Sequence, residues 1–200
     1  VAYGSDTQKV KQILLECANA NKKVLKKPAS KFFTVNAKNT VEEVTEDTKH
    51  PFFSLIYESD QYRKANMWNK EIAVLRKAMK KFGISSFIMI KMGRAYRHLG
   101  NFAKAMECYR RALSISPEDG LVYCNMGVLC YAQGNYETAI YYYKQAMRYM
   151  SDQDAEFSTF LANYALALGT VGSKEQAVFM LNRAESLGYQ NADIIRNKLG

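Results

Sequence analysis

Few side chains in this sequence of 200 residues are placed for covalent chemistry. The histidines are His50 and His98, and no serine or cysteine stands beside His98 as a nucleophile. The H-E-x-x-H metal motif, the nucleophile elbow and the phosphate-binding loop are absent from the sequence. We therefore expect a protein that is not an enzyme and needs no cofactor.

The four cysteines also lack the spacing of a reactive or metal-binding site. None belongs to a C-x-x-C pair, which disfavours zinc and a disulfide framework; they are Cys17, Cys108, Cys124 and Cys130. Packed, reduced cysteines are typical of a cytoplasmic protein. No apolar stretch reaches the roughly 18 residues of a membrane span. The sequence thus predicts a cytoplasmic protein with no membrane span in this chain.

Positive charge is the chemistry that this sequence offers in quantity. Residues 61–111 contain thirteen Lys and Arg against two Glu, whereas residues 112–200 contain six basic and nine acidic residues. A basic surface suits an acidic protein partner or nucleic acid. Nucleic acid is disfavoured because no recognition motif is present. The alternative is a solvated helix face, which fits Lys70, Lys77, Lys80 and Lys81.

A period of 34 residues defines the elements that must position these side chains. Gly93 and Gly127 are separated by 34 residues, and so are Gly100 and Gly134. Other pairs share this spacing: Tyr62 with Tyr96, Ala105 with Ala139, Tyr109 with Tyr143, and Ala112 with Ala146. A fixed period of this length indicates one supersecondary unit copied along the chain. Stacked repeats form extended surfaces, which favours binding over catalysis.

Each unit reads as two helices joined by a turn. Apolar residues recur at helical spacing from Met89 to Tyr96, and Gly100-Asn101 interrupts them as a turn dipeptide. A second apolar stripe follows from Phe102 to Leu113, and Pro117 closes the unit. We therefore predict an all-α fold, a solenoid of helix-turn-helix repeats.

This pattern resembles the tetratricopeptide repeat, W-x2-L-G-x2-Y, then A-x3-F, then P. Residues 86–119 and 120–153 match it best, with small departures such as Met92 for Leu and Cys130 for Tyr. A third copy, 158–191, is shifted by four residues, which we place in the polar run from Ser151 to Asp154. A degenerate first copy occupies residues 52–85. The predicted repeat domain spans 51–200 and ends in a truncated capping helix with Ile194, Ile195 and Leu199.

The resemblance implies a peptide-binding groove on the concave face, lined by the first helix of each repeat. Projecting the family's groove positions onto this sequence selects Arg94, Arg97, Asn125, Val128, Tyr131, Asn163 and Leu166. Arginine forks suit a carboxylate, and the amide of an asparagine suits a peptide backbone. The alternative role for the asparagines is a bond between adjacent helices.

The expected occupant is an acidic or partly apolar protein segment. One subclass of the family grips the C-terminal carboxylates of chaperone tails with Lys at the fifth helix position. Here that position holds Ile90, Cys124 and Ala162, which argues against this specificity. A helix or the chain's own N-terminal region are alternative occupants.

A different function is self-assembly. The aromatic residues Tyr141, Tyr142 and Tyr149, or the last repeat, would then contact a second copy in a homodimer or larger scaffold.

The first fifty residues lack the repeat pattern and form a separate predicted region. An amphipathic helix is expected around Val10–Cys17, and Phe32–Val35 has the character of a short strand. Residues 1–30 also resemble part of the cytosolic portion of small mechanosensitive channels, on the run Val1–Asp6 with later apolar pairs and Pro28. That likeness includes no pore helix and implies no conduction.

Overall fold

The computed structural model describes residues 51–199, where every regular element is a helix. The predicted helix and strand of residues 1–50, and Cys17, lie outside the described residues. The helices are α3 (Pro51–Lys64), α4 (Trp68–Phe82), α5 (Ser86–His98), α6 (Phe102–Ile115), α7 (Gly120–Ala132), α8 (Tyr136–Tyr149), α9 (Phe157–Thr170), α10 (Lys174–Ser186) and α11 (Ala192–Leu199). The predicted all-α fold is therefore confirmed for the described range.

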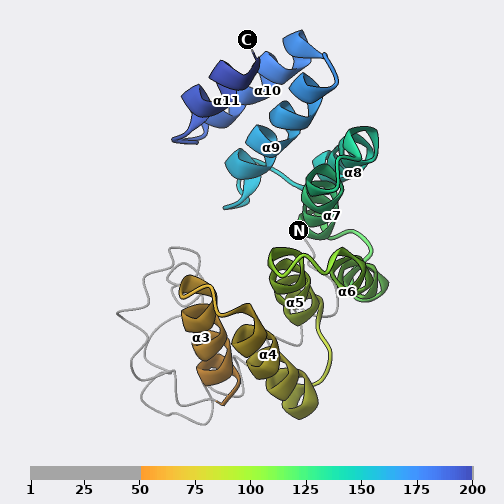
Figure 1. Cartoon of the computed structure of the whole chain (residues 1–200), viewed down its shortest axis with the longest axis vertical. Coiled ribbons are helices and arrows are strands. Elements are labelled where there is room, and N and C mark those ends of the chain that lie inside the picture. The colour runs from red at the N-terminus through yellow and green to blue at the C-terminus, as the bar shows by residue number, and fades with distance from the viewer. Residues whose placement is uncertain (1–50, 200) are drawn as a thin grey trace.

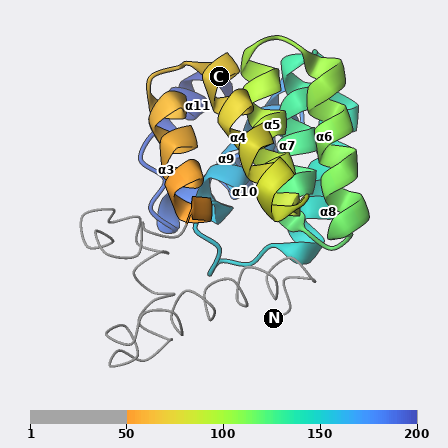
Figure 2. The same ribbon diagram turned by 90° about the horizontal axis from the view of Figure 1, so that it is seen from below.

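Consecutive helices form antiparallel hairpins, and the hairpins stack along the long axis of the molecule (Figure 1). The pairs α3–α4, α5–α6, α7–α8 and α9–α10 succeed one another, and α11 packs on α9 and α10. Seen along the stack, α6 and α8 lie on the outer side of α5 and α7 (Figure 2). The first helices of successive repeats thus share one face, as a helical solenoid requires.

The repeated glycines set how closely the two helices of a hairpin approach. A Cβ atom on Gly127 would lie 2.5 Å from Cε1 of Tyr143, and one on Gly93 would overlap the ring of Tyr109. Both tyrosines are buried on the second helix of the same hairpin. The 34-residue spacing of glycine and tyrosine therefore reflects one packing contact made twice.

Polar caps fix where the first helices begin. Asp119 Oδ1 accepts hydrogen bonds from the backbone N–H of Leu121 at 3.0 Å and of Val122 at 3.3 Å. The other carboxylate oxygen of Asp119 accepts a bond of 3.1 Å from the hydroxyl of Ser86. Because Ser86 starts α5 and Asp119 caps α7, this pair ties together the first turns of neighbouring repeats.

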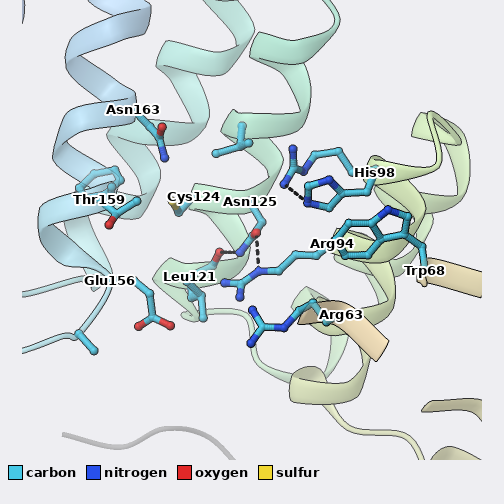
Figure 3. Close-up of a pocket in the computed structure, with 14 residues that line it drawn as sticks. Arg63, Trp68, Arg94, His98, Leu121, Cys124, Asn125, Glu156, Thr159 and Asn163 are labelled. Atoms are coloured by element: carbon cyan, nitrogen blue, oxygen red, sulfur yellow. Dashed lines mark hydrogen bonds between the residues drawn. The ribbon is translucent and has the colours of Figure 1, made fainter. Parts of the chain in front are cut away.

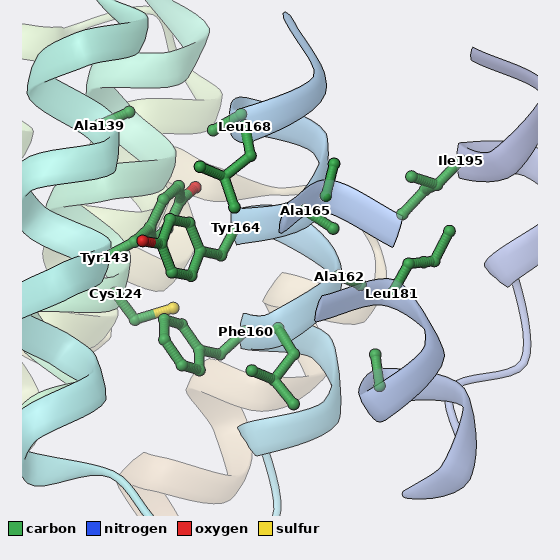
Figure 4. Close-up of a cluster of buried hydrophobic side chains, with 14 of the residues drawn as sticks. Cys124, Ala139, Tyr143, Phe160, Ala162, Tyr164, Ala165, Leu168, Leu181 and Ile195 are labelled. Carbon is green, nitrogen blue, oxygen red and sulfur yellow. The ribbon is translucent and has the colours of Figure 1, made fainter. Parts of the chain in front are cut away.

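The core between the predicted repeats 120–153 and 158–191 is aromatic (Figure 4). The ring of Tyr143 on α8 lies 5.6 Å from that of Tyr164 and 6.1 Å from that of Phe160, both on α9. Ala165 occupies the glycine position of α9 and is fully buried. Aromatic packing therefore holds α9 against the preceding hairpin despite the longer connection between α8 and α9.

None of the helices in residues 51–199 combines the length and apolarity that crossing a membrane would demand.

Candidate functional site

A cavity of about 380 Å³ opens on the face formed by α5, α7 and α9 (Figure 3). This volume lies within the usual range for ligand sites. Its lining comes from five of the described helices and the α8–α9 connection: Arg63, Trp68, Arg94, Arg97, His98, Leu121, Cys124, Asn125, Val128, Ala155, Glu156, Thr159, Phe160 and Asn163. The site is thus built from residues of all four predicted repeats.

Arg94 is held across the boundary between two repeats. Its Nε donates a hydrogen bond of 2.9 Å to Oδ1 of Asn125, and Nδ2 of Asn125 donates one of 2.6 Å to the backbone carbonyl of Leu121. Asn125 is only 6% exposed. In this structure Asn125 therefore performs the helix-bridging role that the sequence left as an alternative to peptide binding.

The cationic wall is the side of the cavity that carries Arg63, Arg94 and Arg97. At Arg97 this wall adjoins His98 and Trp68. A guanidinium has only donors, so Nη2 of Arg97 donates to Nε2 of His98 at 3.2 Å. The His98 ring stacks on Trp68 at 4.1 Å between centroids, with 6° between the planes. Burial and the neighbouring Arg97 lower the pKa of His98, which favours the neutral ring that this bond requires.

Charged residues of α3, α4 and α5 adjoin Arg94. The Oδ1 atom of Asp60 contacts Nζ of Lys91 at 2.5 Å and Nε of Arg63 at 3.3 Å, so one carboxylate oxygen serves two cations. Glu71 is buried, and neither of its carboxyl oxygens has a hydrogen-bond partner among the described residues. Burial raises the pKa of Glu71 to about 7, although Lys91, Arg63 and Arg94 act to lower it.

The opposite wall comes from α9 and the connection that precedes it. Glu156 and Asn163 lie across the cavity from Arg63 and Arg94 in Figure 3. Within the described residues the Asn163 amide has no hydrogen-bond partner. The two walls are therefore chemically different: one is cationic, and the other combines a carboxylate with neutral polar and apolar groups.

The structure gathers five of the seven predicted groove residues around this cavity: Arg94, Arg97, Asn125, Val128 and Asn163. Tyr131 and Leu166 do not line it. The Tyr131 hydroxyl instead lies 3.2 Å from Oγ1 of Thr170, and Oγ1 donates to the carbonyl of Leu166 at 2.8 Å. These two predicted positions thus belong to the contact between α7 and α9 beside the cavity.

Sequence reasoning missed several lining residues, among them Arg63, Trp68 and Glu156. Arg63 and Trp68 come from the degenerate repeat, where no motif marks the groove register. Glu156 follows the inserted connection, which the repeat pattern does not cover. Local clustering of basic residues in 61–111 was the one signal that pointed toward Arg63.

The cavity contains neither an activated thiol nor a metal-binding cluster among the described residues. Burial raises the pKa of the Cys124 thiol to about 12, which keeps it protonated and unreactive at neutral pH. No group of three metal-binding side chains occurs between residues 51 and 199. The groups that the cavity exposes are the guanidinium donors, the Asn163 amide and apolar side chains such as Leu121 and Val128.

Comparisons with known proteins agree with this architecture. The family model described as tetratricopeptide repeat matches residues 85–152. Anaphase-promoting complex subunit 6 of Dictyostelium discoideum is 34% identical over 77 residues, 38% of this chain and 9% of that protein. Human protein O-mannosyl-transferase TMTC1 is 33% identical over 98 residues, 49% of this chain and 10% of that protein. The chain thus spans about a tenth of the length of the curated relatives it matches.

A solved structure of Pseudomonas aeruginosa pilF has the same fold, with a TM-score of 0.64, 20% identity, and coverage of 74% of this chain and 67% of that chain. The likeness of residues 1–30 to small mechanosensitive channels is not borne out, since the comparisons return helical-repeat proteins. Residues 85–152 match the tetratricopeptide repeat, and the stacked hairpins of the described residues share the fold of the solved structure.

Proposed function

We propose that this chain is a non-catalytic binding scaffold that holds a segment of another protein in the cavity between α5, α7 and α9. The observation that carries the proposal is the convergence of Arg63, Arg94 and Asn163 from separate helices on one cavity. A segment lying between the two walls would contact side chains from all four predicted repeats. Tetratricopeptide repeats commonly mediate protein–protein interaction and assembly, which supports this role.

The chemistry of the walls indicates what such a segment contains. Guanidinium groups at Arg63, Arg94 and Arg97 favour acidic side chains. Leu121 and Val128 add apolar surface between the walls, so a segment with both acidic and apolar residues fits best. The Asn163 amide is available to pair with the backbone of an extended segment.

A random peptide library displayed on phage tests the proposal. Peptides enriched on the wild-type chain should bind Arg94→Ala at least fivefold more weakly, and Arg110→Ala with unchanged affinity. Arg110 is exposed on α6 and does not line the cavity, which makes it a matched control. Circular dichroism should report equal helicity for both variants. Equal affinity for wild type and Arg94→Ala would contradict the groove as the binding surface.

A second candidate function is self-assembly through the last repeat. Phe179 on α10 is 64% exposed and Ile194 on α11 is 57% exposed, the largest apolar exposures of the terminal helices. Burying such side chains against a second copy would be favourable. Light scattering over a concentration series tests this candidate. A mass that rises with concentration in wild type and stays monomeric in Phe179→Ser supports it, and a constant monomer mass refutes it.

A further inference from the structure

The cationic wall carries more positive charge than the described carboxyl groups balance. Arg63, Arg94 and Arg97 line the cavity and Lys91 lies beside them, and the carboxyl groups near these four cations are Asp60 on α3 and Glu71 on α4. Asp60 is shared between Lys91 and Arg63. Neither Arg94 nor Arg97 forms an ion pair with a described carboxylate, and the hydrogen bond of each goes to a neutral side chain. The wall therefore keeps an excess of at least two positive charges.

The guanidinium groups that carry this excess positive charge lie around one part of the cavity. Arg63 from α3 and Arg94 from α5 extend toward the same part of the cavity, beside Leu121 (Figure 3). The Nε atom of Arg94 is occupied by Asn125, which fixes the side chain and leaves its terminal nitrogens facing the cavity. Arg97 lines the same cavity one helical turn further along α5. Guanidinium groups held in this way are pre-organised for an anion.

We propose that the groove reads a phosphorylated side chain of its partner segment, bound by Arg63, Arg94 and Arg97. This proposal rests on the proposed function and names the chemistry of its ligand. A phosphate monoester carries nearly two negative charges and three acceptor oxygens, whereas a carboxylate carries one charge and two oxygens. The two negative charges of the phosphate therefore match the positive charge excess of the cationic wall, and its three oxygens match the three guanidinium groups. Glu156, on the other side of the cavity, would favour placing the anion against the arginine wall.

Degenerate nonapeptide pools that differ only at the central residue test the proposal. One pool has phosphoserine at its centre, a second has glutamate and a third has serine, each immobilised at equal density. Retention of the labelled full chain should give an apparent affinity for the phosphoserine pool at least tenfold above that for the glutamate pool. Equal affinities for the phosphoserine and glutamate pools would overturn the phosphate proposal and leave the groove proposal standing. Failure of all three pools would overturn both.

Variants locate the effect. Arg63→Gln and Arg94→Gln should each reduce the preference for phosphoserine at least fivefold, and Arg110→Gln should leave it intact. The side chain of Arg63 is 43% exposed, so its substitution tests the site even where Arg94→Gln impairs folding. A preference that survives both groove variants would overturn the proposal. Single-stranded oligonucleotides serve as a further probe. If they compete with the phosphoserine peptides and bind with equal affinity, the groove is a general polyanion-binding surface and the phosphate proposal is overturned.

Discussion

Arg94 on α5 and Asn125 on α7 are joined by a hydrogen bond of 2.9 Å between Nε and Oδ1, so one asparagine aligns a groove arginine across a repeat boundary. The same amide is anchored to the carbonyl of Leu121 at 2.6 Å. The orientation of Arg94 thus depends on two adjacent repeats rather than on its own helix.

Replacing Asn125 should therefore cost stability as well as binding. Asn125→Ala leaves Nε of Arg94 without its acceptor and should lower the free energy of unfolding by about 1–2 kcal/mol. Asn163→Ala is the matched control, because the Asn163 amide makes no hydrogen bond to a described residue and should cost less than about 0.5 kcal/mol. Urea denaturation measures both values, and equal losses would contradict the bridging role of Asn125.

Glu71 should make stability depend on pH. Burial raises its pKa from 4.5 to about 7. Between these pH values the Glu71 carboxyl is therefore still protonated in the folded state and already ionised in the unfolded state. Stability should fall as the pH rises from about 4.5 to 7, because ionising the buried carboxyl then costs free energy. At about 1.4 kcal/mol for each pKa unit, the full cost is roughly 3 kcal/mol.

The variant Glu71→Gln isolates this effect. The neutral amide should make the chain more stable than wild type at pH 8 and leave the two similar at pH 5, as measured by urea denaturation at each pH. Other titrating groups cancel in the comparison. A stability difference that is the same at both pH values would refute the linkage to Glu71.

The glycine–tyrosine contact should tolerate no added methyl group. Gly127→Ala places a Cβ atom 2.5 Å from Cε1 of Tyr143, and overpacking of this kind costs about 1–3 kcal/mol. The better helix propensity of alanine offsets up to about 1 kcal/mol of that cost. Thermal unfolding should therefore show a lower Tm for Gly127→Ala. A Tm at or above that of wild type would contradict this prediction, because α7 and α8 would then have moved apart at no cost in stability.

Trp68 gives a direct optical signal from the cavity. It is the single tryptophan of the chain, and it lines the cavity against the His98 ring. Binding of an acidic peptide from the phage selection should change its emission.

Glu156→Gln removes the carboxylate on the opposite wall and should raise the affinity about twofold to fivefold, since exposed charge pairs contribute up to about 1 kcal/mol. An affinity lowered by Glu156→Gln would place the acidic side chains of the peptide elsewhere.

The sequence predicts the helices of this fold well because one contact repeats. Gly93 packs on Tyr109 and Gly127 packs on Tyr143, and both pairs are separated by sixteen residues, so a single steric requirement appears as a period in the sequence. The aromatic contact between Tyr143 and Tyr164 extends the stack after the inserted connection, where the period shifts. The period in the sequence therefore predicts the close packing of the two helices in each hairpin.

The site was only partly predictable because its cationic wall comes from two repeats, one regular and one degenerate. Arg94 and Arg97 stand at groove positions of a regular repeat, and the family resemblance finds them. Arg63 and Trp68 reach the cavity through the superhelical stacking of a degenerate repeat, which no local pattern reports. The bond that Asn125 makes to Arg94 also depends on the relative placement of two helices.

Mapping a selected peptide onto the chain by NMR tests the central claim most directly. Backbone amide signals of the ¹⁵N-labelled protein would be followed during titration with a peptide from the phage selection. We predict shifts concentrated on the cavity-facing residues of α5, α7 and α9, together with a shift of the Trp68 indole signal. Shifts confined to α10 and α11 around Phe179, with the Trp68 indole unmoved, would contradict the groove as the binding surface.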